Sequence, residues 1–162
     1  MTVRRGLLTG ALAITILAGI SAAAEATAGS EGTPVCRSMV GTSVLPVWAR
    51  GGFSDPKPRI PHVLGRSGRI VAVLFASPLL SPPPRDHNNK ILWVARKVDG
   101  SALRLRAQRL NGSARVGAPA SRKILGGPGP SIVNLPAPGC WRLTLHWAGQ
   151  TDSLDLRYQR RR

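Results

Sequence analysis

The sequence predicts an all-β protein, an antiparallel β-sandwich formed by a single domain. Two observations indicate this fold class. Short apolar or alternating runs recur between residues 61 and 158, and residues typical of tight turns separate them. Helical periodicity is scarce in the same region. With 162 residues, 43% of them hydrophobic, the chain can bury one core but is too short for a multidomain enzyme.

An N-terminal signal peptide is expected to precede this domain and to cover residues 1–28. Arg4 and Arg5 come before an apolar run from Leu7 to Ile20, and a stretch of small residues follows it. Cleavage is expected after Ala28, with Ala24 as the alternative. The apolar run is shorter than the roughly 20 residues that span a bilayer. The protein is therefore expected to be secreted, either extracellular or associated with the cell wall, with no transmembrane span after cleavage.

The rest of the chain is expected to contain three parts. Residues 29–60 form an extended N-terminal segment, residues 61–158 form the β-sandwich, and residues 159–162 form a basic tail. Cys36 and Cys140 are the two cysteines of the chain. Outside the cytoplasm they are expected to form one disulfide. They lack the C-x-x-C spacing that is typical of redox pairs and metal ligands.

Five runs predict the strands. Apart from Arg69, residues 69–76 and 91–95 are continuously apolar, which is typical of strands buried on both faces. Residues 103–108, 141–147 and 154–158 alternate, so one face of each strand should be buried and the other solvated. The parity places Trp93, Trp141 and Trp147 in the core.

The turns between these runs predict the connections. Asp99-Gly100, Asn111-Gly112 and Gly149-Gln150 have the residues that tight hairpins need, so an antiparallel meander is expected. Several short strands at close spacing favour a sandwich of immunoglobulin type, with a small barrel as the alternative. Residues 51–65, 77–89 and 117–130 are rich in proline or glycine and are expected to be surface loops or edges.

One stretch of the chain resembles a known family. The Pro138-Gly139-Cys140-Trp141 element within residues 130–158, together with residues 89–94, is similar to a family of uncharacterised secreted actinobacterial proteins with immunoglobulin-like domains. The resemblance covers roughly residues 60–158. It implies an immunoglobulin-like sandwich with a C-terminal hairpin, and it implies no catalytic residues.

Few residues are suited to catalysis. Asp86 and His87, within the polar run 85–89, are the strongest candidates for a metal or hydrolase site, but adjacent strand residues point apart and a metal needs three or four ligands. The favoured interpretation is a polar loop. His146 is expected to be a solvated strand residue. The protein is predicted not to be an enzyme, and neither a cofactor nor a bound metal is expected.

The charge indicates an anionic partner. The chain has 23 Lys and Arg residues against 7 Asp and Glu, a net charge of +16. Arg104, Arg106, Arg142 and Arg157 occupy outward strand positions and are candidate anion-binding residues. The leading hypothesis is electrostatic association with anionic cell-envelope polymers. A codon-composition bias is the alternative explanation, because arginines greatly outnumber lysines. Specific nucleic-acid binding is not expected, since exposed aromatic platforms are scarce.

A second hypothesis is an extracellular protein-interaction module. Trp48 is the tryptophan expected to be exposed, and the proline-rich segment contains Pro82, Pro83 and Pro84. Together they would present an apolar, loop-borne patch to another protein. Such binding should tolerate salt, whereas electrostatic binding should not.

Overall fold

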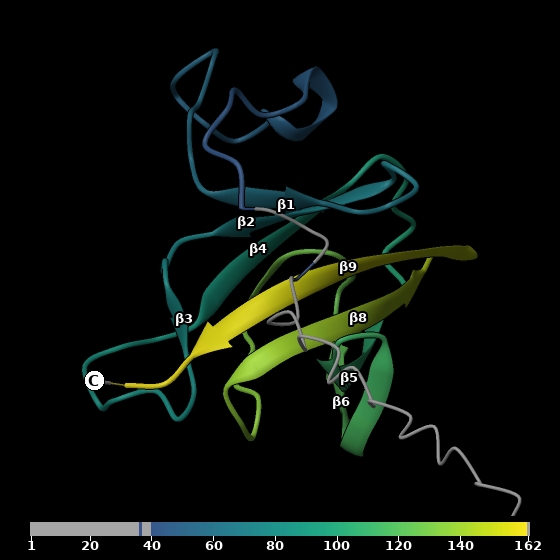
Figure 1. Ribbon diagram of the computed structural model, residues 1–162. Coiled ribbons are helices and arrows are strands. Elements are labelled where there is room, and N and C mark those ends of the chain that lie inside the picture. The colour runs from purple at the N-terminus through teal and green to yellow at the C-terminus, as the bar shows by residue number, and fades with distance from the viewer. Residues whose placement is uncertain (1–35, 37–39, 162) are drawn as a thin grey trace, which may run out of the picture. The chain divides into compact units, whose positions relative to one another are not determined.

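The computed structural model describes residues 36 and 40–161, and these form two β-sheets (Figure 1). The expected all-β class is confirmed, since the only helix in this part of the chain is the short 3₁₀ helix η1 (Val47–Ala49). The predicted signal peptide lies outside the described residues. The strands are β1 (His62–Leu64), β2 (Ile70–Leu74), β3 (Leu79–Leu80), β4 (Lys90–Ala95), β5 (Leu103–Asn111), β6 (Ala114–Ile124), β7 (Pro130–Ile132), β8 (Gly139–Trp147) and β9 (Gln150–Gln159).

The two sheets differ in size and in strand order. The first has the order β1-β2-β4-β7, and the second has the order β3-β9-β8-β5-β6. All pairings are antiparallel except the short parallel pairing of β3 with β9. No helix of membrane-spanning length and hydropathy occurs among residues 40–161.

One hydrophobic core lies between the sheets, as in a β-sandwich. The leucines of β5, β8 and β9 face the apolar residues of β2 and β4 across it. Trp93, Trp141 and Trp147 are all at most 3% exposed, which confirms the predicted inward parity of the tryptophans. Their indole N–H groups donate to Ser131 Oγ, the Ala137 carbonyl and the Lys97 carbonyl. Each buried tryptophan thus keeps the hydrogen bond that its polar atom requires.

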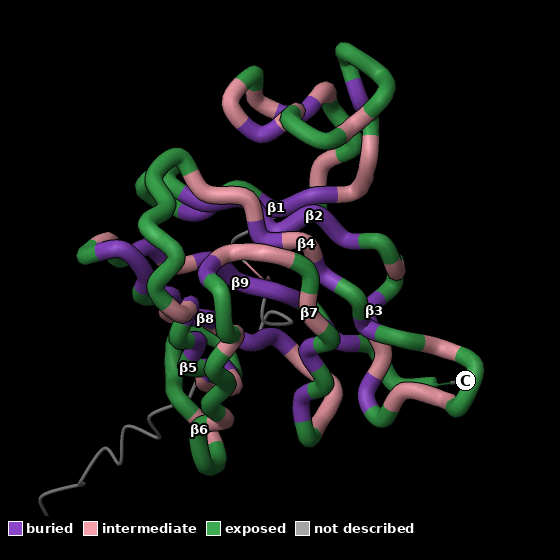
Figure 2. The backbone as a smooth tube through the Cα atoms, turned by 180° about the vertical axis from the view of Figure 1, so that it is seen from behind, coloured by how far each residue is buried: buried purple, intermediate pink, exposed green. Residues whose placement is uncertain are grey.

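A second, smaller core lies on the opposite side of the four-stranded sheet. Val71 and Val73 of β2 face it, while their neighbours in β2 face the main core, so β2 is buried on both faces as predicted. Figure 2 shows this continuous burial of β2. We call residues 44–60 the N-terminal cover, because Leu45, Ala49 and Ile60 pack on these valines. The structure thus adds a 3₁₀ helix and a packed surface to the segment predicted to be extended.

The turns follow the prediction in two of three cases. The β5–β6 hairpin turns at Gly112-Ser113, one residue later than predicted. The β8–β9 hairpin turns at Ala148-Gly149, one residue earlier than predicted. The meander prediction is wrong at Asp99-Gly100. This turn connects β4 in one sheet to β5 in the other. Gly100 has φ +79°, so the local turn chemistry is as predicted, but it does not determine whether the next strand pairs or crosses over.

Residues 117–130, predicted to be a surface loop or an edge, form an edge strand in their first half. β6 continues to Ile124, and its register against β5 shifts opposite Gln108. The Gln108 carboxamide donates to the carbonyls of Val116 and Gly117 at 3.0 and 3.2 Å. Pro119 falls within this irregularity, a place where a strand tolerates proline.

Candidate anion-binding face

The outer face of the five-stranded sheet carries a cluster of exposed cations. Strand register places Arg104 of β5 between Lys123 of β6 and His146 of β8. Arg106 lies two residues further along β5, about 7 Å away at the usual strand rise. All four side chains are exposed. We call this surface the basic face, and it also includes Arg115 of β6 and Arg157 of β9.

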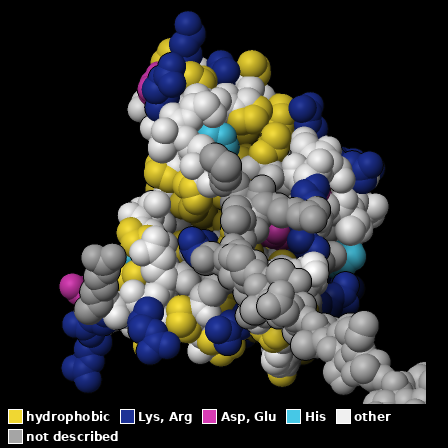
Figure 3. Space-filling model, viewed as in Figure 1, with side chains coloured by type: hydrophobic (Ala, Val, Ile, Leu, Met, Phe, Trp, Pro, Cys, Tyr) yellow, Lys and Arg dark blue, Asp and Glu magenta, His cyan; other side chains and the backbone are white. Residues whose placement is uncertain are grey.

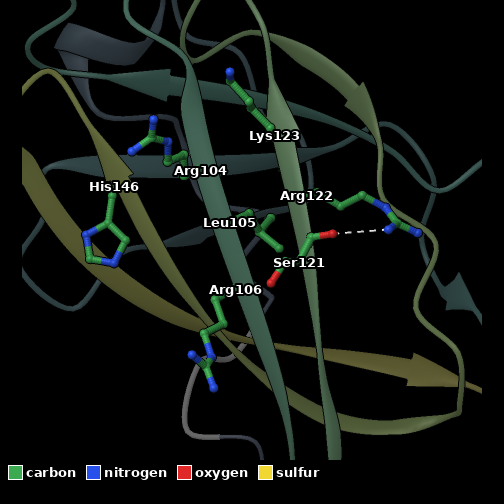
Figure 4. A pocket seen from close by; sticks show the side chains of 7 residues that line it. All are labelled: Arg104, Leu105, Arg106, Ser121, Arg122, Lys123 and His146. Carbon is green, nitrogen blue, oxygen red and sulfur yellow. Dashed lines mark hydrogen bonds between the residues drawn. The ribbon is translucent and has the colours of Figure 1, made fainter.

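A hollow of about 430 Å³ opens on the basic face. Arg104, Arg106, Lys123 and His146 line it, as Figure 4 shows. Arg104, Arg106 and His146 lie on the same side of β5, whereas the Arg122 side chain turns away and donates to the Ser121 carbonyl at 3.1 Å. The hollow is shallow and open, which suits part of a long polymer better than an enclosed small molecule.

Three further hollows lie on the same sheet. A hollow of about 380 Å³ at the β8–β9 turn shares Arg104 and His146 with it. A third includes Arg106 and Arg115, and a fourth includes Arg157. No carboxylate lines any of these four hollows within the described part of the chain. The local field at the basic face is therefore set by cations.

Arg142 differs from Arg104 and Arg106 because its guanidinium is already bound to a carboxylate of the protein. Its Nε and Nη2 donate to Asp155 at 2.9 and 3.3 Å, and Arg66 Nη2 donates to the same carboxylate at 2.8 Å. The hydrogen bond to Asp155 raises the pKa of Arg142 above its ordinary value. The prediction that Arg142 offers a free anion-binding group is thus wrong, because a carboxylate already occupies it.

The predicted arginines also do not form one contiguous row. Arg157 pairs in register with Cys140 and, through it, with Leu110. Arg104 lies six residues from Leu110 along β5, about 20 Å at the usual rise. The structure therefore brings Arg104 and Arg106 together and leaves Arg157 at the other end of the sheet. Basic side chains also occur elsewhere on the surface, as the dark blue groups in Figure 3 show.

Asp152 and Asp155 are buried, at 3% and 1% exposure. Asp152 accepts backbone N–H bonds from Ser67, Arg69 and Ser153 at 2.8–3.0 Å. A Cβ at Gly65 would collide with the Asp152 carboxylate. The carboxylate therefore fastens the β1–β2 turn to β9, a long-range contact that local sequence does not reveal.

The predicted disulfide is confirmed. Cys36 and Cys140 are joined with their Cα atoms 5.6 Å apart. Cys140 lies on β8 at the outward parity, so the bond fastens the N-terminal part of the chain to the outer side of the five-stranded sheet. The bond closes a loop of 104 residues.

Sequence reasoning missed Lys123 and Arg115. Both lie in β6, within or next to the segment that was predicted from its glycines and prolines to be a surface loop or an edge. Figure 2 shows that this edge strand is mostly exposed. The Asn111-Gly112 turn carried the signal that could have found them, because a hairpin turn requires a partner strand immediately after it.

Trp48 and the proline-rich segment do not form one patch. Trp48 is half-buried against the second core, and the Arg96 guanidinium lies 4.8 Å from its ring centroid. Pro82 is exposed, whereas Pro83 and Pro84 are half-buried in the loop after β3. The N-terminal cover and this loop lie at different ends of the domain (Figure 1).

The loop with Asp86 and His87 is organised around an asparagine. Asn89 is fully buried. Its amide oxygen accepts from the Leu80 backbone N–H, and its amide nitrogen donates to the Leu80 carbonyl and to Asn134 Oδ1. His87 Nε2 lies 3.2 Å from the same amide oxygen. Among residues 40–161 and Cys36, no three His, Cys, Asp or Glu side chains come together in an arrangement that could hold a metal ion.

Comparisons with known proteins identify no relative of this chain. Protein-family models, curated protein sequences and solved structures were all compared with the chain, and none of them matches it.

Proposed function

We propose that this is a secreted, non-catalytic protein whose basic face associates electrostatically with anionic polymers of the cell envelope. One observation carries the proposal: Arg104, Arg106 and Lys123 surround an open hollow that no described carboxylate lines. These three side chains have no ion-pair partner among the described residues. A polyanion would satisfy their charges without displacing an internal partner.

Two features support an extracellular location. The apolar run with its two preceding arginines is typical of a signal peptide. The Cys36–Cys140 disulfide is of the kind that persists in oxidising compartments.

We also propose an immunoglobulin-like sandwich related to the secreted actinobacterial family that the Pro-Gly-Cys-Trp element resembles. The two sheets, the hairpins and the buried Trp93 support this assignment. One feature differs from antibody domains, where a tryptophan packs on a disulfide that joins the two sheets. Here Cys140 is outside the main core and its bond leads to Cys36.

The electrostatic proposal is tested by binding to immobilised anionic wall polymer at low and high salt. Retention should fall steeply with salt, because exposed charges are screened over about 10 Å at 0.1 M. The triple variant Arg104→Gln, Arg106→Gln, Lys123→Gln should bind roughly 100-fold more weakly, at about 1 kcal/mol per cation.

The matched control is Lys57→Gln, Arg59→Gln, Arg85→Gln, which removes three exposed cations elsewhere on the surface. It should keep most of the affinity. Equal losses in the two triple variants would show that net charge alone is responsible, and salt-independent retention would contradict an electrostatic mechanism.

A protein-interaction module remains the second candidate. Val47, next to Trp48 in η1, is 76% exposed, which gives the N-terminal cover one apolar tip. Binding through this tip should tolerate high salt and be lost in Val47→Asp, which leaves the packed side of the cover unchanged.

A further inference from the structure

Two hollows on the basic face are adjacent and have a common wall. Arg104 and His146 line both of them. Their volumes are about 430 and 380 Å³, each within the range of small-ligand sites. A ligand that extends across this wall contacts both hollows at once. The two different linings together therefore determine which chemical groups the ligand must have.

The linings differ in chemistry. Besides Arg122, whose guanidinium turns away to the Ser121 carbonyl, the first hollow has three cations, Arg104, Arg106 and Lys123. The second replaces Arg106 and Lys123 with neutral polar groups, Ser101, Gln150 and Thr151, around the β8–β9 turn. Gln150 is half-buried, and its carboxamide makes no hydrogen bond to another described residue. It is therefore able to donate and accept toward a ligand.

His146 is held in place between the two hollows. Its Nδ1 lies 2.9 Å from Thr151 Oγ1. When the Thr151 hydroxyl donates to Nδ1, the imidazole carries its proton on Nε2. That N–H is then a directed donor on the wall that the two hollows have in common.

We infer that the two hollows form one site for a unit that carries a phosphate group next to hydroxyl groups, such as a repeat of a polyol-phosphate or sugar-phosphate polymer. The phosphate binds Arg104, Arg106 and Lys123, and the hydroxyl groups bind Gln150, Thr151 and Ser101. This inference rests on the proposed function and specifies its ligand.

The number of cations favours phosphate over carboxylate. A carboxylate has about four acceptor sites. The Asp155 carboxylate accepts three hydrogen bonds from Arg142 and Arg66 in this structure. Two arginines and a lysine around one hollow offer more donors than a single carboxylate accepts. A phosphate group has the additional oxygens that match them.

Asp99 marks the limit of the site. The Ser101 amide donates to its carboxylate at 2.9 Å, and hydrogen bonds from the Ser101 hydroxyl and amide lower the pKa of Asp99. Its negative charge at this edge disfavours a second phosphate there. The hydroxyl-bearing part of the ligand must therefore lie on the Ser101 side.

The inference is tested by NMR titration of the ¹⁵N-labelled protein with glycerol 1-phosphate, inorganic phosphate and glycerol. Glycerol 1-phosphate should bind about tenfold more tightly than inorganic phosphate and shift residues of both hollows, because the additional hydrogen bonds form at the second hollow. The variants Thr151→Val and Gln150→Ala should remove this preference. Thr144→Val, on the same sheet face but outside both hollows, is the matched control and should retain it.

Retention on an immobilised glycerol-phosphate polymer and on polyphosphate of equal charge separates the two proposals. Preference for the glycerol-phosphate polymer, lost in Thr151→Val, supports the site. Equal binding to both polymers, with equal affinities for the two small phosphates, overturns the site and leaves electrostatic association intact. Absence of binding to either polymer at low salt overturns both proposals.

Discussion

The outer faces of the two sheets differ in burial: part of one is covered by another segment of the chain, and part of the other is exposed. On the four-stranded sheet, Val71 and Val73 point away from the main core, and the N-terminal cover buries them. On the five-stranded sheet, the corresponding positions carry Arg104, Arg106 and His146, which remain exposed. An apolar outer face is thus covered by another segment of the chain, whereas an outer face with basic side chains remains exposed to solvent. The comparison indicates that the continuous apolar run of β2 already required a second layer.

The largest expected effect concerns the disulfide that anchors the chain ahead of the N-terminal cover. Cys36→Ala with Cys140→Ala should lower the free energy of unfolding by up to about 4.7 kcal/mol, the chain-entropy value for a loop of about 100 residues. Urea unfolding of the oxidised protein and of the double variant measures the difference. A loss below about 1 kcal/mol would show that packing of the cover on the sheet holds this part of the chain without the bond.

The cover itself is tested by two neighbouring apolar residues. Leu45 is fully buried on the second core, and Val47 is 76% exposed. Leu45→Ala should cost about 3 kcal/mol, because it removes buried methyl groups and leaves a cavity. Val47→Ala should change the stability by less than about 0.5 kcal/mol. Similar midpoints for both variants in urea unfolding would mean that the cover contributes little to the fold.

The sequence predicted those parts of the fold that local pattern determines. Strict alternation in residues 103–108 and 141–147 places Leu105 and Leu143 inside and Arg104 and Arg106 outside, and the structure confirms this. The apolar run of β2 predicted burial on both faces, although not the segment that covers it. Alternation has a period of two residues, so it assigns faces reliably wherever one face is buried.

The sequence did not predict contacts that depend on topology. Asp99-Gly100 has hairpin chemistry but connects the two sheets, since local turn preferences do not encode which strand comes alongside. Arg142 has the same outward parity as Arg104, but register places Asp155 directly opposite it. Alternation therefore identified outward cations correctly, and only the strand pairing showed which of them are neutralised. The candidate site was predicted in part for this reason.

The smallest effects distinguish these two kinds of arginine on one face. Arg142→Gln leaves Asp155, which is 1% exposed, with fewer charge-assisted hydrogen bonds. It should cost about 1–2 kcal/mol, a modest loss because the Arg142 side chain is partly solvated and Arg66 still donates to the carboxylate. Arg104→Gln should change the stability by less than about 0.5 kcal/mol, since Arg104 has no carboxylate partner among the described residues.

Thermal or urea unfolding of the two single variants, alongside their binding to anionic polymer, measures this difference. Arg142→Gln should lose stability and keep its binding to the polymer. Arg104→Gln should keep its stability and bind the polymer more weakly. A stability loss in Arg104→Gln as large as that in Arg142→Gln would mean that Arg104 contributes to the fold. Weakened binding in that variant would then no longer identify the basic face as a ligand surface. A cation whose partner is an external ligand should be removable without a change in the stability of the fold.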